Sequence, residues 1–127
     1  MYLGIDLGRK KTGLATSDGN LASPYKIITH NSLRQALEKI VKEIEIISAS
    51  TVVLGFTSGS NKKYFENFKQ LLEATLPKIK IVMWEETLTT RQARQTMVKL
   101  HIPQRKKAKK EDAIAASIIL QEYLDSK

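Results

Sequence analysis

Three acidic positions in this sequence could together hold a metal ion. Asp6 lies between glycines in a short apolar run, Glu85 and Glu86 end another such run, and Asp112 follows a basic segment. Glycine weakens a strand and is tolerated best where a ligand or another backbone must come close. Because an unpaired buried carboxylate is costly, Asp6 needs a hydrogen-bond donor or a cation beside it.

A cluster of these carboxylates would favour Mg²⁺ or Mn²⁺ over zinc, because hard cations prefer oxygen ligands. A pair of such ions can activate an attacking water and stabilise the departing oxygen, which is the chemistry of phosphodiester cleavage. Simpler interpretations stay open: Asp6 could bond to local backbone, and Asp112 could complement a helix dipole. Only one of Glu85 and Glu86 can face a given site, and the pattern does not say which.

Two basic runs adjoin Asp6 and Asp112. The first run comprises Arg9, Lys10 and Lys11, and the second comprises Arg105, Lys106, Lys107, Lys109 and Lys110. A charged run is usually a solvated loop, but the position of these runs beside proposed ligands predicts that they bind nucleic-acid phosphates. The 21 Lys and Arg against 13 Asp and Glu give a net charge of +8, which suits a polyanionic partner.

Length and composition narrow the class of protein. A chain of 127 residues predicts one domain, 1–127. Cysteine is absent, which excludes disulfides and thiolate zinc sites and fits a cytoplasmic location. No secretory leader and no apolar window of about 20 residues is present, so we expect no membrane contact. His30 and His101 have no metal-ligand spacing and are assigned no role.

The elements that must position these residues follow from hydrophobic periodicity. Strands are predicted at 2–8, 12–18 and 25–29, then a helix from residue 33 with Ser32 and Gln35 in a capping box. A buried strand at 51–55, a helix over 64–76 and a strand at 79–84 come next. A helix from Thr89 to Pro103, a basic loop at 104–110 and a last helix from Asp112 to Leu124 complete the chain.

This order predicts an α/β fold with a mixed five-stranded sheet, in which three antiparallel N-terminal strands precede alternating strands and helices that cover both faces. In the first strand, period-two alternation puts one set of residues on one face and a second set on the other. The first set is Leu3, Ile5 and Leu7, and the second is Gly4, Asp6 and Gly8. Strand ends and helix starts meet at one sheet edge, where such sheets place ligands.

The sequence resembles a known family over essentially its whole length: the small bacterial RNase H-like proteins described as pre-16S rRNA nucleases or Holliday junction resolvases. Four blocks carry the resemblance: Gly4-Ile5-Asp6-Leu7-Gly8 with residues 13–18, Val53-Leu54-Gly55, residues 85–90, and residues 110–116 with Ile119 and Leu120. The resemblance implies an RNase H-like fold, metal-dependent nuclease chemistry and a ligand trio of Asp6, Glu86 and Asp112. It thereby selects Glu86 over Glu85.

The sequence departs from the usual pattern of this family at four positions. Thr57 stands where proline is typical, Glu85 where Asp is typical, and Lys11 and Thr87 where arginines are typical. Arginine binds phosphate in a bidentate fork that lysine and threonine cannot reproduce. These departures bear on phosphate contacts more than on the fold.

Several functions remain in competition. The family resemblance favours 5′-end processing of pre-16S rRNA, with structured RNA as the partner, and the alternative is cleavage of Holliday junctions in branched DNA. Symmetric junction cleavage would call for a dimer, and we expect a monomer or weak homodimer. A non-catalytic RNA-binding module is a third interpretation. The same Gly-x-Asp-x-Gly opening occurs in sugar kinases and chaperone ATPases, but those need two such domains.

Overall fold

The computed structural model of the chain describes residues 1–57, 59, 61–86 and 104–127, with side chains over the same residues except 104–112. Its elements are β1 (Tyr2–Asp6), β2 (Lys11–Ser17), β3 (Ala22–Thr29), α1 (Leu33–Ile47), β4 (Thr51–Phe56), α2 (Lys62–Thr75), β5 (Lys80–Glu85) and α4 (Gln104–Asp125). The helix predicted from Thr89 to Pro103 lies outside the described residues.

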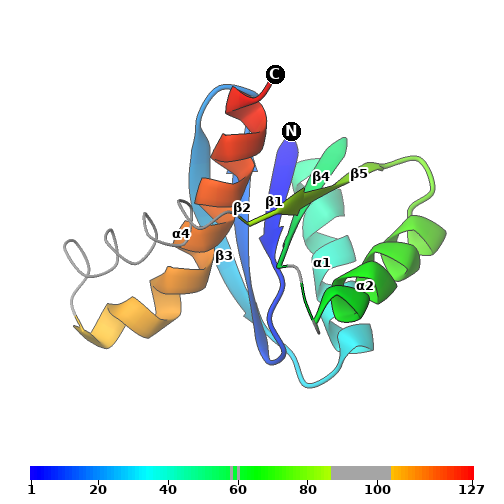
Figure 1. Cartoon of the computed structure of the whole chain (residues 1–127), viewed down its shortest axis with the longest axis horizontal. Helices are drawn as coiled ribbons and strands as arrows, with labels where there is room; N and C mark the ends of the chain where they lie inside the picture. Colours follow the sequence, from blue (N-terminus) through cyan, green and yellow to red (C-terminus); the bar gives the residue numbers. More distant parts are fainter. Residues whose placement is uncertain (58, 60, 87–103) are drawn as a thin grey trace.

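The five strands form one sheet in the order β3-β2-β1-β4-β5, so β1 is the central strand. The β1–β2 and β2–β3 pairs are antiparallel, whereas the β1–β4 and β4–β5 pairs are parallel. Helices α1 and α2 cover one face of the sheet and α4 covers the other (Figure 1). The predicted mixed sheet, with its antiparallel N-terminal part and helices on both faces, is confirmed.

Two hydrophobic clusters on opposite faces confirm the alternation predicted for β1. Leu3 and Ile5 are fully buried among apolar residues of α1 and α2, such as Ile40 and Phe68. The opposite cluster joins Val53 of β4 to apolar residues of α4. Asp6 alternates with Ile5 and therefore lies on the α4 face of the sheet.

Glycines let α4 come unusually close to the two central strands. A Cβ atom on Gly4 would lie 2.8 Å from Leu120 Cβ and 2.9 Å from the carbonyl oxygen of Ala116. A Cβ on Gly55 would lie 2.5 Å from Cδ1 of Ile119. Side chains at these strand positions would push the helix outward, so the two glycines set the distance between α4 and the sheet.

The predicted loop at 104–110 is wrong, because α4 begins at Gln104 and includes that whole basic segment. Gln, Arg, Lys and Ala are all good helix formers, and neither glycine nor proline interrupts the helix after Gln104. Pro103 directly precedes the helix, and proline is compatible with a helix start. The lack of an apolar stripe in this segment led to the loop prediction, although absence of a stripe does not prevent a helix.

The third strand is longer than predicted and starts at Ala22. It includes Pro24, which is tolerated because β3 is an edge strand of the sheet. Leu14 pairs with Lys26 and Ala15 pairs with Pro24, so Tyr25 is the extra residue of a β-bulge. The proline and the bulge obscured the beginning of the strand in the sequence pattern.

A buried carboxylate joins the bulge of β3 to α1. Glu43 accepts hydrogen bonds from the hydroxyl of Tyr25 at 2.7 Å and from Nζ of Lys26 at 3.0 Å. Burial by itself would raise the pKa of Glu43, but the two hydrogen bonds and the charges of Lys26 and Lys42 outweigh it and lower the pKa. The contact fixes the C-terminal half of α1 against the edge strand.

The capping box predicted for α1 forms in part. The Oγ atom of Ser32 accepts a hydrogen bond from the backbone N–H of Gln35, as predicted. The side chain of Gln35 accepts from the backbone N–H of Asn31, one residue before the cap residue. Both side chains thus satisfy backbone donors at the helix entry.

The two ends of the described chain lie side by side (Figure 1). Nζ of Lys127 lies 3.2 Å from the hydroxyl of Tyr2 and 5.0 Å from the ring centres of Tyr2 and Tyr123. The ring of Trp84 meets Tyr123 edge-on, and its Nε1 donates to Glu122. The C-terminal end of α4 is therefore fastened over the beginning of β1.

We expect Gly4→Ala to destabilise the protein more than Gly55→Ala. The new methyl group at position 4 meets a backbone oxygen and a Cβ atom, which can move only with the helix, and such overpacking costs about 1–3 kcal/mol. At position 55 the nearest atom is the far end of a side chain, and a strained rotamer costs about 1 kcal/mol. Urea unfolding of both variants measures the difference; an equal or smaller loss for Gly4→Ala would contradict this packing.

Candidate active site

Asp6 is the last residue of β1 and is half-buried on the α4 face of the sheet. Its partners in the strand register are glycines on both sides, Gly13 in β2 and Gly55 in β4. The two residues paired directly with Asp6 therefore carry no side chain of their own. The predicted flanking by glycine within β1 is thus matched by glycine across the sheet.

The strand β5 distinguishes Glu86 from Glu85. Trp84 packs in the cluster beneath α4, whereas Met83 packs in the cluster with α1 and α2. The backbone N–H of Glu86 donates to the carbonyl oxygen of Phe56 at 2.8 Å, which extends the pairing of β5 with β4 by one residue. By alternation Glu86 shares the face of Trp84 and Asp6, and Glu85 belongs to the other face.

Burial agrees with this assignment of faces. Glu85 is exposed, whereas Glu86 is half-buried and its Oε1 atom is shielded from solvent. Trp84 and Asp6 lie in one line of the register across Gly55. Glu86 therefore lies at the same end of the sheet as Asp6, two strands away and two residues further along, which is about 12 Å between backbones.

Asp112 does not open the last helix, as the sequence pattern had suggested. It lies more than two turns after Gln104, the first residue of α4. The favourable effect of a helix dipole on an acid is confined to the first turn. The interpretation of Asp112 as a simple partner of the helix N-terminus is therefore wrong.

The backbone of Asp112 lies toward the Asp6 end of β1. Helix α4 runs opposite to β1, since Tyr123 lies over Tyr2 and Ala116 lies over Gly4. Asp112 precedes Ala116 by one turn, about 6 Å along the helix, and Asp6 follows Gly4 by about the same distance along the strand. The side chain of Asp112 lies outside the described residues.

The donors present suit a hard cation. Asp6 and Glu86 offer oxygen ligands from one face of the sheet, and no cysteine occurs in the chain. Among the side chains that the structure describes, no three acidic, histidine or cysteine residues are grouped so that they could hold a metal ion. Of the predicted trio, the structure describes the side chains of Asp6 and Glu86, and both offer the oxygen donors that a hard cation prefers.

The basic turn after β1 depends on glycine. A Cβ atom on Gly8 would lie only 2.2 Å from the carbonyl oxygen of Lys11, so the turn is closed too tightly for any other residue. The backbone N–H of Gly8 donates to the hydroxyl of Thr12 at 3.3 Å. We call residues 9–11 the basic turn; its three side chains are exposed, as expected of residues that bind phosphate.

Helix α2 holds the basic turn from one side. The guanidinium of Arg9 lies 4.0 Å from the ring centre of Tyr64 and donates to Oδ1 of Asn61 at 3.2 Å. The Tyr64 hydroxyl donates to the carbonyl oxygen of Gly8 at 3.0 Å. Burial raises the pKa of Tyr64, although the charge of Arg9 opposes the shift, so the hydroxyl stays a donor at neutral pH.

His30 holds the basic turn from the other side, a role that the sequence interpretation missed. Its side chain is 3% exposed, its Nε2 lies 2.8 Å from Oγ1 of Thr12, and its backbone N–H donates to the carbonyl oxygen of Lys10. Burial, and secondarily the charge of Lys39, lowers the pKa of His30. In the sequence, Tyr64 could have been recognised as a hydroxyl on the otherwise apolar stripe of a predicted helix, whereas no pattern marked His30.

The second basic run is placed only by its backbone. Its five residues lie in the first turns of α4, before Asp112, and their side chains are outside the described part of the chain. Thr87, where the family has arginine, is also outside it. In the helices that are described, none combines the length and apolar character needed to cross a bilayer.

We expect the stability of the protein to fall with decreasing pH through His30. A folded-state pKa below the ordinary 6.5 means that folding favours the neutral ring, so this stabilisation is present above pH 6.5 and is lost as the pH falls below it. In His30→Gln the difference in unfolding free energy between pH 7.5 and 5.5 should shrink. The wild type is the reference, and an unchanged pH difference in His30→Gln would contradict the role of His30.

Three relatives match this chain over 98% of its length. Proteins of Acetivibrio thermocellus, Carboxydothermus hydrogenoformans and Staphylococcus epidermidis are 37%, 36% and 34% identical to it, and the matches cover 95%, 96% and 94% of their own lengths. Each is named "Putative pre-16S rRNA nuclease".

Solved structures of resolvases have a similar fold. The Fowlpox virus Holliday junction resolvase superposes with a TM-score of 0.63 at 12% identity and 99% coverage of both chains. Thermus thermophilus RuvC, solved with a Holliday junction substrate, gives 0.62 at 13% identity, covering 98% of this chain and 94% of RuvC. The model of the family described as "RuvX: Holliday junction resolvase" matches residues 1–126. The chain therefore belongs to the RuvX family and has an RNase H-like fold.

Proposed function

We propose that this protein is a metal-dependent nuclease that hydrolyses phosphodiester bonds in the 5′-end processing of pre-16S rRNA. The observation that carries the proposal is the common face of Asp6 and Glu86 at one end of the sheet, on the side crossed by α4. The name shared by the relatives supports rRNA as the substrate. The positive charge of the chain supports a polyanionic partner.

In the proposed site Asp6, Glu86 and Asp112 hold Mg²⁺ or Mn²⁺. When bound, two such ions would activate the attacking water and stabilise the departing oxygen. Asp6 ends the central strand and is paired with Gly13 and Gly55, so neither directly paired residue carries a side chain of its own. The central strand β1 gives Asp6 a rigid support, which ligand geometry for Mg²⁺ requires.

The basic residues bind the substrate in this proposal. Arg9 is restrained by Tyr64 and Asn61, so less side-chain freedom is lost when it contacts phosphate. Lys10 and Lys11 extend the positive surface from the basic turn. The run at 105–110 enters α4 just before Asp112 and would contact the same nucleic acid from the other side of the site.

Cleavage of Holliday junctions is the second candidate function. It is favoured by the match to a family described by that activity over residues 1–126. Cutting both strands of a junction symmetrically would need a dimer with two active sites. A pre-16S rRNA 5′ end and a four-way DNA junction, compared at equal enzyme concentration, separate the two: preferential cleavage of the junction would overturn the rRNA assignment.

We expect Glu86→Gln to reduce cleavage by more than about 100-fold, since even the loss of an outer-shell partner of a metal costs about 10–100-fold. The neighbouring Glu85→Gln is the matched control, because Glu85 belongs to the opposite face, and it should stay within about threefold of the wild type. Rates are measured on the pre-16S RNA with Mg²⁺ or Mn²⁺, and EDTA should stop the reaction. Equal effects of the two variants would contradict the proposed ligand.

We also expect Asp6→Asn to abolish cleavage while RNA affinity, measured by filter binding, stays nearly that of the wild type. The amide removes a metal ligand but leaves the basic residues in place, and these dominate affinity for a polyanion. If the wild-type protein cleaves neither RNA nor branched DNA with either ion, the non-catalytic RNA-binding module is correct. Affinity that does not weaken with rising salt would refute phosphate binding by the basic residues.

A further inference from the structure

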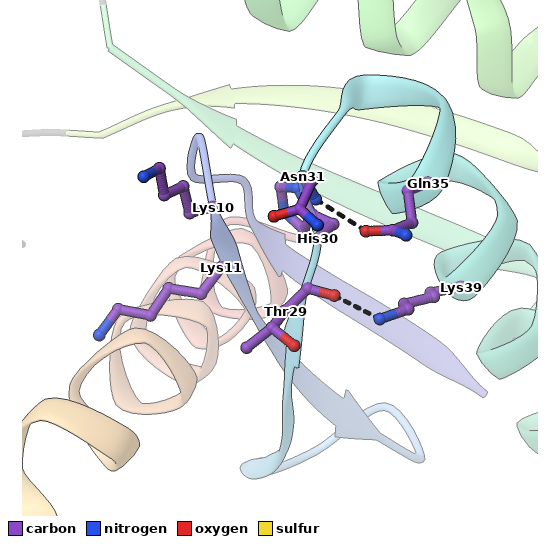
Figure 2. Close-up of a pocket in the computed structure, with 7 residues that line it drawn as sticks. All are labelled: Lys10, Lys11, Thr29, His30, Asn31, Gln35 and Lys39. Carbon is purple, nitrogen blue, oxygen red and sulfur yellow. Dashed lines mark hydrogen bonds between the residues drawn. The ribbon is translucent and has the colours of Figure 1, made fainter.

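A cavity of about 430 Å³ lies where the basic turn meets the beginning of α1 (Figure 2). Lys10 and Lys11 reach it from the turn, and Lys39 reaches it from the second turn of α1. Figure 2 shows Lys39 on one side of residues 29–31 and the two turn lysines on the other. We call this cavity the α1 basic pocket.

The charge in the α1 basic pocket is of one sign. Three lysines line it, and none of its described lining residues is acidic. Ion pairs in the described part of the chain engage Lys26, Lys62 and Lys69, and neither Lys10 nor Lys39 takes part in one. These positive charges give the pocket a potential that attracts an anion.

Neutral groups in the pocket add hydrogen-bonding capacity. His30 lines it, and Nδ1 of this buried ring has no hydrogen-bond partner among the described residues. If the Thr12 hydroxyl donates to Nε2, then Nδ1 carries the proton and is a donor at the pocket floor. The side chain of Asn31 is a further lining group, at the positive end of the α1 dipole.

The positions of the lysines are set by the fold. Lys11 pairs with Thr29 across the β2–β3 ladder, and the backbone N–H of His30 donates to the carbonyl oxygen of Lys10. Nζ of Lys39 donates to the carbonyl oxygen of Thr29, which holds its ammonium at the rim of the cavity. The ammonium of Lys39 is therefore held at the end of β3, and the backbones of Lys10 and Lys11 are fixed beside it.

The α1 basic pocket lies at the same end of the sheet as Asp6. Asp6 pairs with Gly13, and Lys11 lies two residues before Gly13 in β2. Thr29 lies on the next strand, β3. Two strand spacings and an offset of two residues along the strand put the pocket roughly 12 Å from Asp6. With about 3.4 Å per nucleotide along a duplex strand, this is about three to four nucleotides.

We propose that the α1 basic pocket binds a backbone phosphate of the nucleic-acid substrate three to four nucleotides from the bond that is cleaved. The inference rests on the proposed nuclease function and adds a phosphate subsite with a new binding residue, Lys39. The pocket thereby fixes the distance between the active site and one phosphate of the substrate backbone. It selects substrates by the length of chain that continues past the cleavage site.

The test is Lys39→Gln against the control Lys42→Gln, an exposed lysine on α1 that does not line the pocket. RNA affinity is measured by filter binding in EDTA at several salt concentrations. We expect Lys39→Gln to bind 3- to 10-fold more weakly and to reduce the slope of log affinity against log salt by about 1, as for one lost phosphate contact. Lys42→Gln should match the wild type, and Lys39→Arg should restore both values.

Substrate length provides the second readout. RNAs that end one or two nucleotides beyond the cleavage site on either side cannot fill the pocket, so wild type and Lys39→Gln should bind the RNA shortened on the relevant side equally. Equal affinity and slope for the two proteins on long RNA would overturn the pocket. A loss of equal size on long and both short RNAs would also overturn it, because the effect would then be on the fold.

Binding in EDTA requires no cleavage, so the pocket and the nuclease proposal can fail separately. If Lys39→Gln does not weaken RNA binding while the wild type still cleaves RNA, only the subsite is rejected. If Lys39→Gln weakens RNA binding but the wild type does not cleave, only the nuclease function is rejected. Inorganic phosphate is titrated as well, with the histidine resonances followed by NMR. If phosphate shifts the His30 signals but Lys39→Gln leaves the RNA affinity unchanged, the pocket binds free phosphate alone. That outcome would overturn the nucleic-acid assignment.

Discussion

The close contact between α4 and the backbone of β1 determines where every part of the candidate site lies. Gly4 has no side chain, so Ala116 and Leu120 rest directly on the central strand of the sheet. Asp6 follows Gly4 on the same face, and Glu86 reaches that face from β5. A helix held farther from the sheet would carry Asp112 away from both. The separation of helix and strand is therefore a condition for the proposed site as well as for packing.

The positive surface beside the site is organised in a comparable way, by contacts that fix its backbone. Tyr64 from α2 and His30 from the end of β3 both bind the turn that carries Arg9, Lys10 and Lys11. These contacts join elements that precede and follow α1. Cations on a fixed turn lose less entropy on binding phosphate than cations on a free loop. The buried His30 ring and the Tyr64 hydroxyl thus hold the backbone of the basic turn in place.

Patterns of local periodicity predicted most of the fold, because strand alternation and helical stripes are local properties. The face of Asp6 and the cap at Ser32 followed from neighbours a few residues away. Contacts between distant elements could not be predicted in this way, and so His30 and Lys39 were missed. Alternation alone does not say which face meets α4, so only the family resemblance selected Glu86, and the packing of Trp84 now supplies a structural reason for placing Glu86 on the face of Asp6. The start of α4 was missed because charged helix formers lack a stripe.

Lys127 packs over Tyr2 and Tyr123, which brings the chain ends together at the end of the strands farthest from Asp6. A short linker between residues 127 and 1 could close the polypeptide into a ring without crossing the candidate site. New ends could then be opened at an exposed connection such as the turn at Asp18 and Asn20. Labels or fused domains attached at that end would likewise remain about the length of a strand away from a bound nucleic acid. The molecule is therefore suited to circular permutation and to immobilisation with its binding face directed outward.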